Sequence, residues 1–283
     1  MWFKNLKLYR LDLNRILTAD DFYDAMEQQR FQPCSSQDAQ SSGWVPPRED
    51  SGLLPTSVIN QAARERALQI EEQQGYKPGR KQMKEIKEAV TMELLPKSHV
   101  IQRDTRVWID TKNGWFVIDA SAAAQSDEVL GLLAKTLTPL PIVPLHVEMS
   151  PGAAMTLWLS EDEAPAGFTI DQDTQLQSTG ESRASVRYQR QSVDADEVRR
   201  HIEAGKQCTR LALTWNDRVS FVLTDNLDIK RVAPLDVLKE NQDAQAANEA
   251  ERLDADFALM TGELARLLDD LVAAVDGIRA DPQ

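Results

Sequence analysis

Residues 77–87 read KPGRKQMKEIK, which places five basic side chains and one acidic side chain within eleven positions. The whole chain carries a formal net charge of −13, so this local concentration of positive charge runs against the overall balance. Lysine and arginine side chains gathered on one surface can neutralise nucleic-acid phosphates without reading base sequence. A basic helix face can equally be a solvated surface without a partner, and these residues alone leave both interpretations open.

Side chains that could catalyse a reaction are sparse. The nearest approach to a phosphate-binding loop is Gly205-Lys206, which lacks an earlier glycine and a following hydroxyl, so we expect it to end a helix. None of the short spacings of a zinc site connects the three histidines, which are His99, His146 and His201. Asp110 and Asp119 end two predicted facing strands and could together hold Mg²⁺, which keeps a nuclease open as an alternative. We expect a protein that is not an enzyme and requires neither a cofactor nor a metal.

The composition is that of an ordinary globular chain, with 283 residues, 42% hydrophobic and 27% charged. The first residues, MWFKNLKLYRLDL, alternate apolar and polar positions, so we expect neither a signal peptide nor a membrane span and place the protein in the cytosol. Cys34 and Cys208 lie far apart, and reduced thiols are expected. Residues 235–283 contain four basic and twelve acidic side chains, whereas residues 61–112 contain eleven basic and eight acidic ones. A cationic surface can therefore coexist with the negative net charge of the whole chain.

The first part of the chain combines predicted strands with predicted helices. Residues 2–13 alternate as a strand, and a capping pattern from Thr18 opens a helix over residues 19–29. Two amphipathic stripes flank the turn at Pro78-Gly79 and predict an antiparallel helical hairpin within residues 53–96. The basic side chains of its second helix lie outside the apolar stripe of that helix. RVWIDTKNGWFVIDA, residues 106–120, predicts a β-hairpin with positive φ angles at the Asn-Gly turn.

The remaining pattern predicts an α+β fold. We predict strands at 139–147, 154–159, 185–193, 210–216, 219–226 and 229–232, a polar and flexible stretch at 171–184, and helices at 126–137, at 192–204 and over the last fifty residues. The expected architecture has antiparallel sheets with packed helices, a protruding helical hairpin and a helical C-terminus. We divide it into a central domain of residues 1–52 and 97–150, the hairpin of residues 53–96, and a C-terminal domain of residues 151–283.

Several stretches of the chain occur in the same order in one known family. They are MWFKNLKLYRL at the start, FQPCSSQD at 31–38, GWVPP at 43–47, LLPTSVI at 53–59, LLPK at 94–97, WIDTKNG at 108–114, DASAA at 119–123, LPIVPL at 140–145, HIEAGK at 201–206 and DADFALMTGELA at 254–265. No single stretch is diagnostic. Their ordered combination over nearly the whole chain resembles the recombination-associated protein RdgC family.

The resemblance implies a non-enzymatic, cytoplasmic, nucleoid-associated protein that binds single- and double-stranded DNA with little sequence preference. It also implies a ring-shaped homodimer, closed by two self-contacts, whose positively lined hole admits duplex DNA and which restrains the RecA recombinase by occupying its DNA. Such a ring can place its few cations on the inner rim and its carboxylates outside. Two alternatives stay open beside it: a metal-dependent DNA-processing enzyme, and a protein-interaction scaffold whose basic hairpin meets an acidic partner.

The resemblance also suggests particular contact residues. A Lys/Arg-rich region of the family matches seven residues that we expect to contact DNA: Arg64, Arg66, Lys77, Arg80, Lys81, Lys84 and Lys87. Arg190 and Gln191 match a basic residue and a glutamine at a ring-closing contact. His99 falls where relatives carry an aromatic residue at a self-contact. Between Pro47 and Leu53 relatives carry a longer segment, and we expect unobserved or renumbered residues there in preference to a true deletion.

Overall fold

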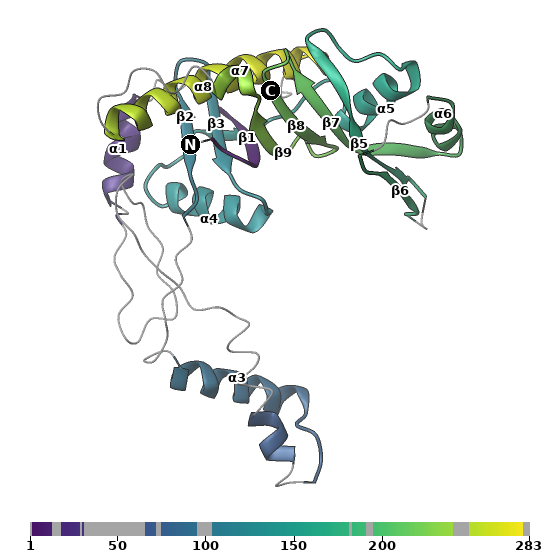
Figure 1. Cartoon of the computed structure of the whole chain (residues 1–283). Helices are drawn as coiled ribbons and strands as arrows, with labels where there is room; N and C mark the ends of the chain where they lie inside the picture. Colours follow the sequence, from purple (N-terminus) through teal and green to yellow (C-terminus); the bar gives the residue numbers. More distant parts are fainter. Residues whose placement is uncertain are drawn as a thin grey trace. The chain divides into compact units, whose positions relative to one another are not determined.

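The computed structural model describes residues 2–12, 18–28, 30, 66–71, 75–94, 104–180, 183–190, 195–239 and 249–279. The chain divides into two compact units. The larger unit contains Met1–Thr18, Thr105–Gly131 and Pro139–Gln283, and the smaller contains Ala19–Asp104 and Leu132–Thr138. Figure 1 labels the helices and strands. The segment between Pro47 and Leu53, where relatives are expected to carry additional residues, lies outside the described residues.

The larger unit is built on one antiparallel sheet. Its strand order is β2-β3-β1-β9-β8-β7-β5-β6, and β4 also pairs with β1. The strands are β1 Leu6–Leu11, β2 Val107–Asp110, β3 Trp115–Asp119, β4 Ile142–Pro144, β5 Phe168–Ser178, β6 Ser185–Tyr188, β7 Lys206–Trp215, β8 Val219–Thr224 and β9 Ile229–Pro234. Distant parts of the sequence meet where Leu6 of β1 pairs with Ile229 of β9.

Alternation along β7 and β8 gives this part of the sheet one apolar face. Its cross-strand pairs, all with buried side chains, are Leu211–Leu223, Leu213–Phe221 and Trp215–Val219. The turn between the two strands has positive φ angles at Asn216 and Asp217, 46° and 54°. The Arg218 N–H closes the turn by donating to the Trp215 carbonyl across 2.8 Å, and positive φ at the two central residues matches the natural twist of paired strands. The hairpin predicted at 210–226 is therefore confirmed.

Helix α8, Glu249–Ala274, covers this apolar face, and Figure 1 shows it running across the strands. Its inward side chains recur at helical spacing and are almost fully buried; they are Met260, Leu264, Leu267, Leu268 and Leu271. They share one core with α5, Pro151–Glu161, and with α6, Ala195–Glu203. The short helix α7, Asp236–Lys239, adds Leu238 to the same core. The helical C-terminal region predicted from the sequence is confirmed.

Polar contacts hold α8 against the edge of the core. The Glu263 side chain is 1% exposed and accepts two hydrogen bonds from Arg218, at 2.8 and 2.9 Å, and one from Arg266 at 3.0 Å. The hydrogen bonds to Glu263 raise the pKa of Arg218. The indole N–H of Trp215 donates to Asp270 across 2.7 Å. Because a buried carboxylate without a partner is strongly destabilising, the two guanidinium groups let α8 bury Glu263.

The strand predicted at 154–159 is wrong, since these residues lie within helix α5. Ser150 caps the helix by accepting a hydrogen bond from the N–H of Ala153, and Pro151 occupies its first turn. Met155 and Trp158 are buried, and the helix packs on β7. A short apolar run does not distinguish a buried strand from a buried helix, because both bury their side chains along the whole run.

The flexible polar stretch predicted at 171–184 is also wrong over most of its length, because β5 extends to Ser178. The strand lies between β6 and β7 and pairs with both. Leu176 and Thr174 are buried, whereas Gln175 stands on the opposite face beside Arg187. The neighbouring strands supply backbone partners that the composition of this segment does not reveal.

The β-hairpin predicted at 106–120 is confirmed, with a different turn. Gly114 has a φ of 74°, but Asn113 does not have the positive φ that was expected. The Asp110 carboxylate instead accepts hydrogen bonds from the N–H groups of Lys112 and Asn113, at 3.0 and 2.8 Å. An aspartate that binds the backbone two residues ahead stabilises such a turn through its side chain.

Most other predicted elements are present with shifted ends. Helices α1, Ala19–Gln28, and α4, Ala123–Ala134, correspond to those predicted at 19–29 and 126–137. In the smaller unit, residues 66–71 are helical and α3 spans Arg80–Leu94. The two units differ from the three ranges expected from the sequence. One sheet contains strands both from the expected central domain and from residues 151–283, so no unit boundary falls at residue 150.

Candidate nucleic-acid interface

The two helices of the predicted hairpin pack through a small apolar contact. Ile86 and Val90 of α3 are buried against Ala67, Ile70 and Met83, and we name these five residues the hairpin cluster. All five belong to the two apolar stripes that were predicted from helical spacing. The antiparallel helical hairpin is thus supported by a direct contact between its helices. One side of α3 is occupied by this contact, which leaves its other side to the basic residues.

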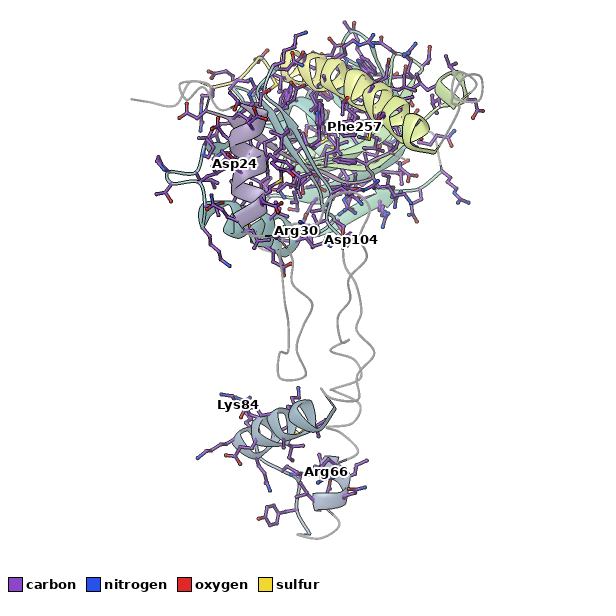
Figure 2. All side chains as sticks on the ribbon, turned by 90° about the vertical axis from the view of Figure 1, so that its left-hand side faces the viewer. Asp24, Arg30, Arg66, Lys84, Asp104 and Phe257 are labelled. Carbon is purple, nitrogen blue, oxygen red and sulfur yellow. The ribbon has the colours of Figure 1, made fainter. Side chains whose placement is uncertain are left out.

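The basic residues of the hairpin are exposed. Six of the seven expected DNA contacts are described, and each is exposed: Arg66, Lys77, Arg80, Lys81, Lys84 and Lys87. Figure 2 shows the side chains of Lys84 on α3 and Arg66 on the other helix. Lys84 forms an ion pair with Glu88 across 3.7 Å, but both side chains are more than half exposed, and such pairs contribute little. Arg64 lies outside the described residues.

A second group of cations, which was not predicted from the sequence, lies on the sheet. Arg187, Arg210, Lys230 and Arg231 line a hollow of about 240 Å³, and we name these four residues the sheet-face cluster. The strand register places Arg187 and Arg210 on either side of Gln175. Because strand side chains alternate between faces, Arg210 points away from the face that Leu211 shares with α8. The cluster therefore lies on the sheet face opposite α8.

Asp173 is the acidic side chain in the described lining of this hollow. Its carboxylate accepts a hydrogen bond from the backbone N–H of Arg190 at 2.9 Å and another from Arg231 at 3.1 Å. The backbone hydrogen bond from Arg190, followed by the contact with Arg231, holds the pKa of Asp173 below its usual value. Arg187 and Arg210 are exposed and form no ion pair with a described residue. The hollow thus combines four cations with one carboxylate.

A weak sequence signal for the sheet-face cluster exists. SVRYQR and RLALTW each belong to a predicted strand. In both, a basic residue alternates with apolar residues, which indicates that the basic side chain faces away from the core. Alternation does not say which strands are neighbours. The approach of β6, β7 and β9 that gathers these cations follows only from the strand order.

The residues expected at the dimer contacts are only partly described. Arg190 is exposed and follows β6, the last strand in the sheet order. Its φ of 51° is uncommon for a residue other than glycine, and the hydrogen bond from its N–H to Asp173 accompanies this conformation. Gln191 and His99 lie outside the described residues. The self-contacts therefore stay a prediction.

The two carboxylates considered for a metal site stand at opposite ends of the β2–β3 hairpin, because its strands are antiparallel. Asp110 lies at the turn, and Asp119 ends β3 four residues beyond Trp115, roughly 14 Å along the strand. The Asp119 carboxylate accepts hydrogen bonds from the N–H groups of Lys4 and Asn5, at 3.0 and 2.9 Å. The two side chains are too far apart to share one ion at ordinary ligand distances. Within the described parts of the chain, no group of three His, Cys, Asp or Glu residues could hold a metal ion.

The fold and its surfaces define an α+β protein with exposed basic residues on both a helix and a sheet. A family model described as "Putative exonuclease, RdgC" matches residues 1–278. A protein of Bordetella parapertussis (strain 12822), named recombination-associated protein RdgC, is 59% identical over 295 residues, which cover 98% of this chain and 99% of that protein. The chain belongs to the RdgC family.

Other relatives carry the same printed name. The protein of Herminiimonas arsenicoxydans is 56% identical over 298 residues, covering 99% of both chains. That of Burkholderia ambifaria (strain MC40-6) is 53% identical over 299 residues, covering 99% of this chain and 98% of the relative. These alignments are longer than the 283 residues of the chain, so the relatives carry residues that have no counterpart in it. No described helix combines the length and the apolar character needed to cross a membrane.

Proposed function

We propose that this protein binds DNA without sequence preference and acts in homologous recombination. The observation that carries the proposal is the pair of cationic surfaces on an acidic chain: the exposed basic residues of the hairpin and the sheet-face cluster. Contacts from lysine and arginine to phosphates position a protein on DNA without reading bases. The names of the relatives indicate recombination as the cellular process, since each is called a recombination-associated protein.

The proposed assembly is a ring-shaped homodimer that encircles DNA. A two-fold ring requires two contacts, each joining a patch to its own copy. We assign one contact to Arg190 and Gln191 and the other to the region of His99. In support, β6 ends the described sheet order just before Arg190, and an unpaired strand edge can pair with another chain. Occupying DNA in this way restrains RecA without requiring direct contact with it, and places the protein on the nucleoid in the cytoplasm.

Salt-dependent DNA binding tests the proposal. We expect similar affinities for duplexes of unrelated sequence, with log K falling linearly with log salt by about 0.9 per phosphate contacted. The triple substitution Arg80→Glu, Lys81→Glu and Lys84→Glu should weaken binding to all sequences alike and flatten this slope. The pair Arg187→Glu and Arg210→Glu should do the same for the sheet face. Lys112→Glu, an exposed change in the β2–β3 turn, is the matched control. Unchanged affinity in both charge-reversed proteins would overturn the proposal.

A nuclease is the second candidate, because the description of the family model names an exonuclease. Incubation of end-labelled duplex and single-stranded DNA with the protein and Mg²⁺ separates the two functions. We expect the label to stay on full-length DNA over a time course in which an exonuclease control releases it. Release of labelled nucleotides that Mg²⁺ chelation abolishes would favour the enzyme.

Sedimentation tests the assembly independently of DNA. We expect a homodimer at micromolar protein concentration, and a shift toward monomer when Arg190→Glu is combined with Gln191→Ala. A wild-type protein that sediments as a monomer would count against the ring while leaving the DNA-binding proposal intact.

A further inference from the structure

The turn of the helical hairpin presents an aromatic side chain among cations. Tyr76 is 62% exposed and stands immediately before Lys77. Arg80 and Lys81 follow within five positions, and all three cations are exposed. Tyr76 does not belong to the hairpin cluster, and its hydroxyl forms no hydrogen bond with another described residue. The side chain is therefore mostly exposed and takes no part in the apolar contact between the two helices.

The backbone on both sides of Tyr76 is held by hydrogen bonds. Gly75 has a φ of 76°, and its N–H donates to the Glu71 carbonyl across 2.8 Å, which ends the first helix in the left-handed conformation. Pro78 restricts its own φ, and the Gly79 carbonyl accepts a 2.8 Å hydrogen bond from α3. A ring on a short connection with fixed ends loses little conformational freedom when a flat partner stacks on it.

An exposed ring beside cations matches the chemistry of an unpaired nucleotide. Its base can stack on the tyrosine while its phosphates meet the neighbouring lysine and arginine side chains. The bases of an intact duplex stack on each other and offer no free face to the ring. We infer that Tyr76 stacks on an unpaired DNA base and gives the hairpin a preference for single-stranded segments. This inference rests on the proposed DNA binding and adds to it a contact that phosphate neutralisation does not supply.

Matched substitutions in the full chain test this role. Affinities for a single strand and for a duplex of equal length would be measured for wild type, Tyr76→Ala and Tyr76→Trp. Stacking on one base corresponds to about a five- to hundredfold loss of single-strand affinity in Tyr76→Ala. Duplex affinity should stay within about twofold, because duplex bases do not reach the ring. Tyr76→Trp should retain single-strand binding. Tyr23→Ala and Leu68→Ala, which alter an equally exposed tyrosine on α1 and an exposed aliphatic side chain in the hairpin, should change neither affinity.

A spectroscopic signal separates stacking from a structural effect of the substitution. The fluorescence of 2-aminopurine in the single strand should change on binding wild type and Tyr76→Trp, and this change should be absent with Tyr76→Ala at saturating protein. Equal losses on both DNAs, or no loss on the single strand, would overturn the inference while the proposed DNA binding stands. A wild-type protein that bound neither DNA would overturn both.

Discussion

Helices α8 and α3 use their charged residues in opposite ways. Helix α8 contains seven acidic and two basic residues, and three of its carboxylates accept hydrogen bonds from side chains of the larger unit. Helix α3 contains four basic and three acidic residues, and its ion pair between Lys84 and Glu88 lies within the helix and is exposed. The charges of α8 therefore fasten a helix to its own core. Those of α3 are presented to solvent.

The two helices also differ in how many apolar side chains they bury. Helix α8 buries five large side chains in the main core, whereas α3 contributes Ile86 and Val90 to the small hairpin cluster. Stability depends on buried apolar area, and a partner needs exposed groups that are not already satisfied. We infer that α8 stabilises the fold and that α3 presents its charged side chains to a binding partner. Four substitutions or conditions test this contrast.

Removing packing should produce the largest difference between the helices. Leu268 of α8 is fully buried, and Leu268→Ala should lower the free energy of unfolding by about 3 kcal/mol because it leaves a cavity. Urea denaturation followed by tryptophan fluorescence measures this loss. Ile86→Ala is the matched change in α3, and we expect it to reduce hydrogen-exchange protection within residues 66–94 without moving the main transition. An equal shift of the main transition by both variants would show that the two helices belong to one cooperative unit.

Removing a partner of Glu263 should have the next largest effect. Arg218→Met deletes two of the three hydrogen bonds to this buried carboxylate, and we expect a loss of about 2 kcal/mol of unfolding free energy. Arg266 is 67% exposed, and Arg266→Met should cost under about 1 kcal/mol because solvent screens its contact. Thermal and urea denaturation of both variants would measure the difference. The reverse order of effects would show that Arg218 is not the main support of α8.

High pH should destabilise the core beneath α8. Cys208 belongs to this core, and burial raises the pKa of its thiol to about 12. A thiol in the unfolded chain ionises near 8.5, roughly as in model peptides. Above that pH the unfolded state loses a proton that the folded state keeps, so stability falls as pH rises towards 12. Between pH 8 and about 9.5 the loss should be about 1 kcal/mol. Urea denaturation of wild type and Cys208→Ala at both values checks this, and an identical decline in the variant would contradict it.

Freeing a cation of the sheet-face cluster should have the smallest effect. Asp173→Asn removes the carboxylate that holds Arg231, while the amide oxygen can still accept the Arg190 N–H. If phosphates reach this hollow, duplex affinity at low salt should rise about threefold, the scale of one exposed ion pair. Fluorescence anisotropy measures the change, and Glu161→Gln, an exposed change on α5, is the control. Unchanged or weaker binding would restrict the DNA surface to the hairpin.

Local patterns predicted the elements whose information lies within a few neighbouring residues. The β7–β8 hairpin follows from alternating apolar positions and from the Asn216-Asp217 turn, and α3 follows from apolar residues at helical spacing. Where one run fits two structures, local reasoning failed. The apolar segment of α5 resembles a strand because it is buried throughout, and polar β5 resembles a loop because its hydrogen-bond partners lie far along the chain.

The sequence by itself determined the family, through short stretches in a fixed order, and the basic character of the hairpin, because its cations are neighbours along the chain. The tertiary structure alone decided that β1 joins β9 in one sheet and that Asp110 and Asp119 are held apart. It also gathered Arg187, Arg210, Lys230 and Arg231 around one hollow. Periodicity tells which face a side chain takes, but the pairing of distant strands is settled by packing over the whole chain, and these residues become neighbours only through that pairing.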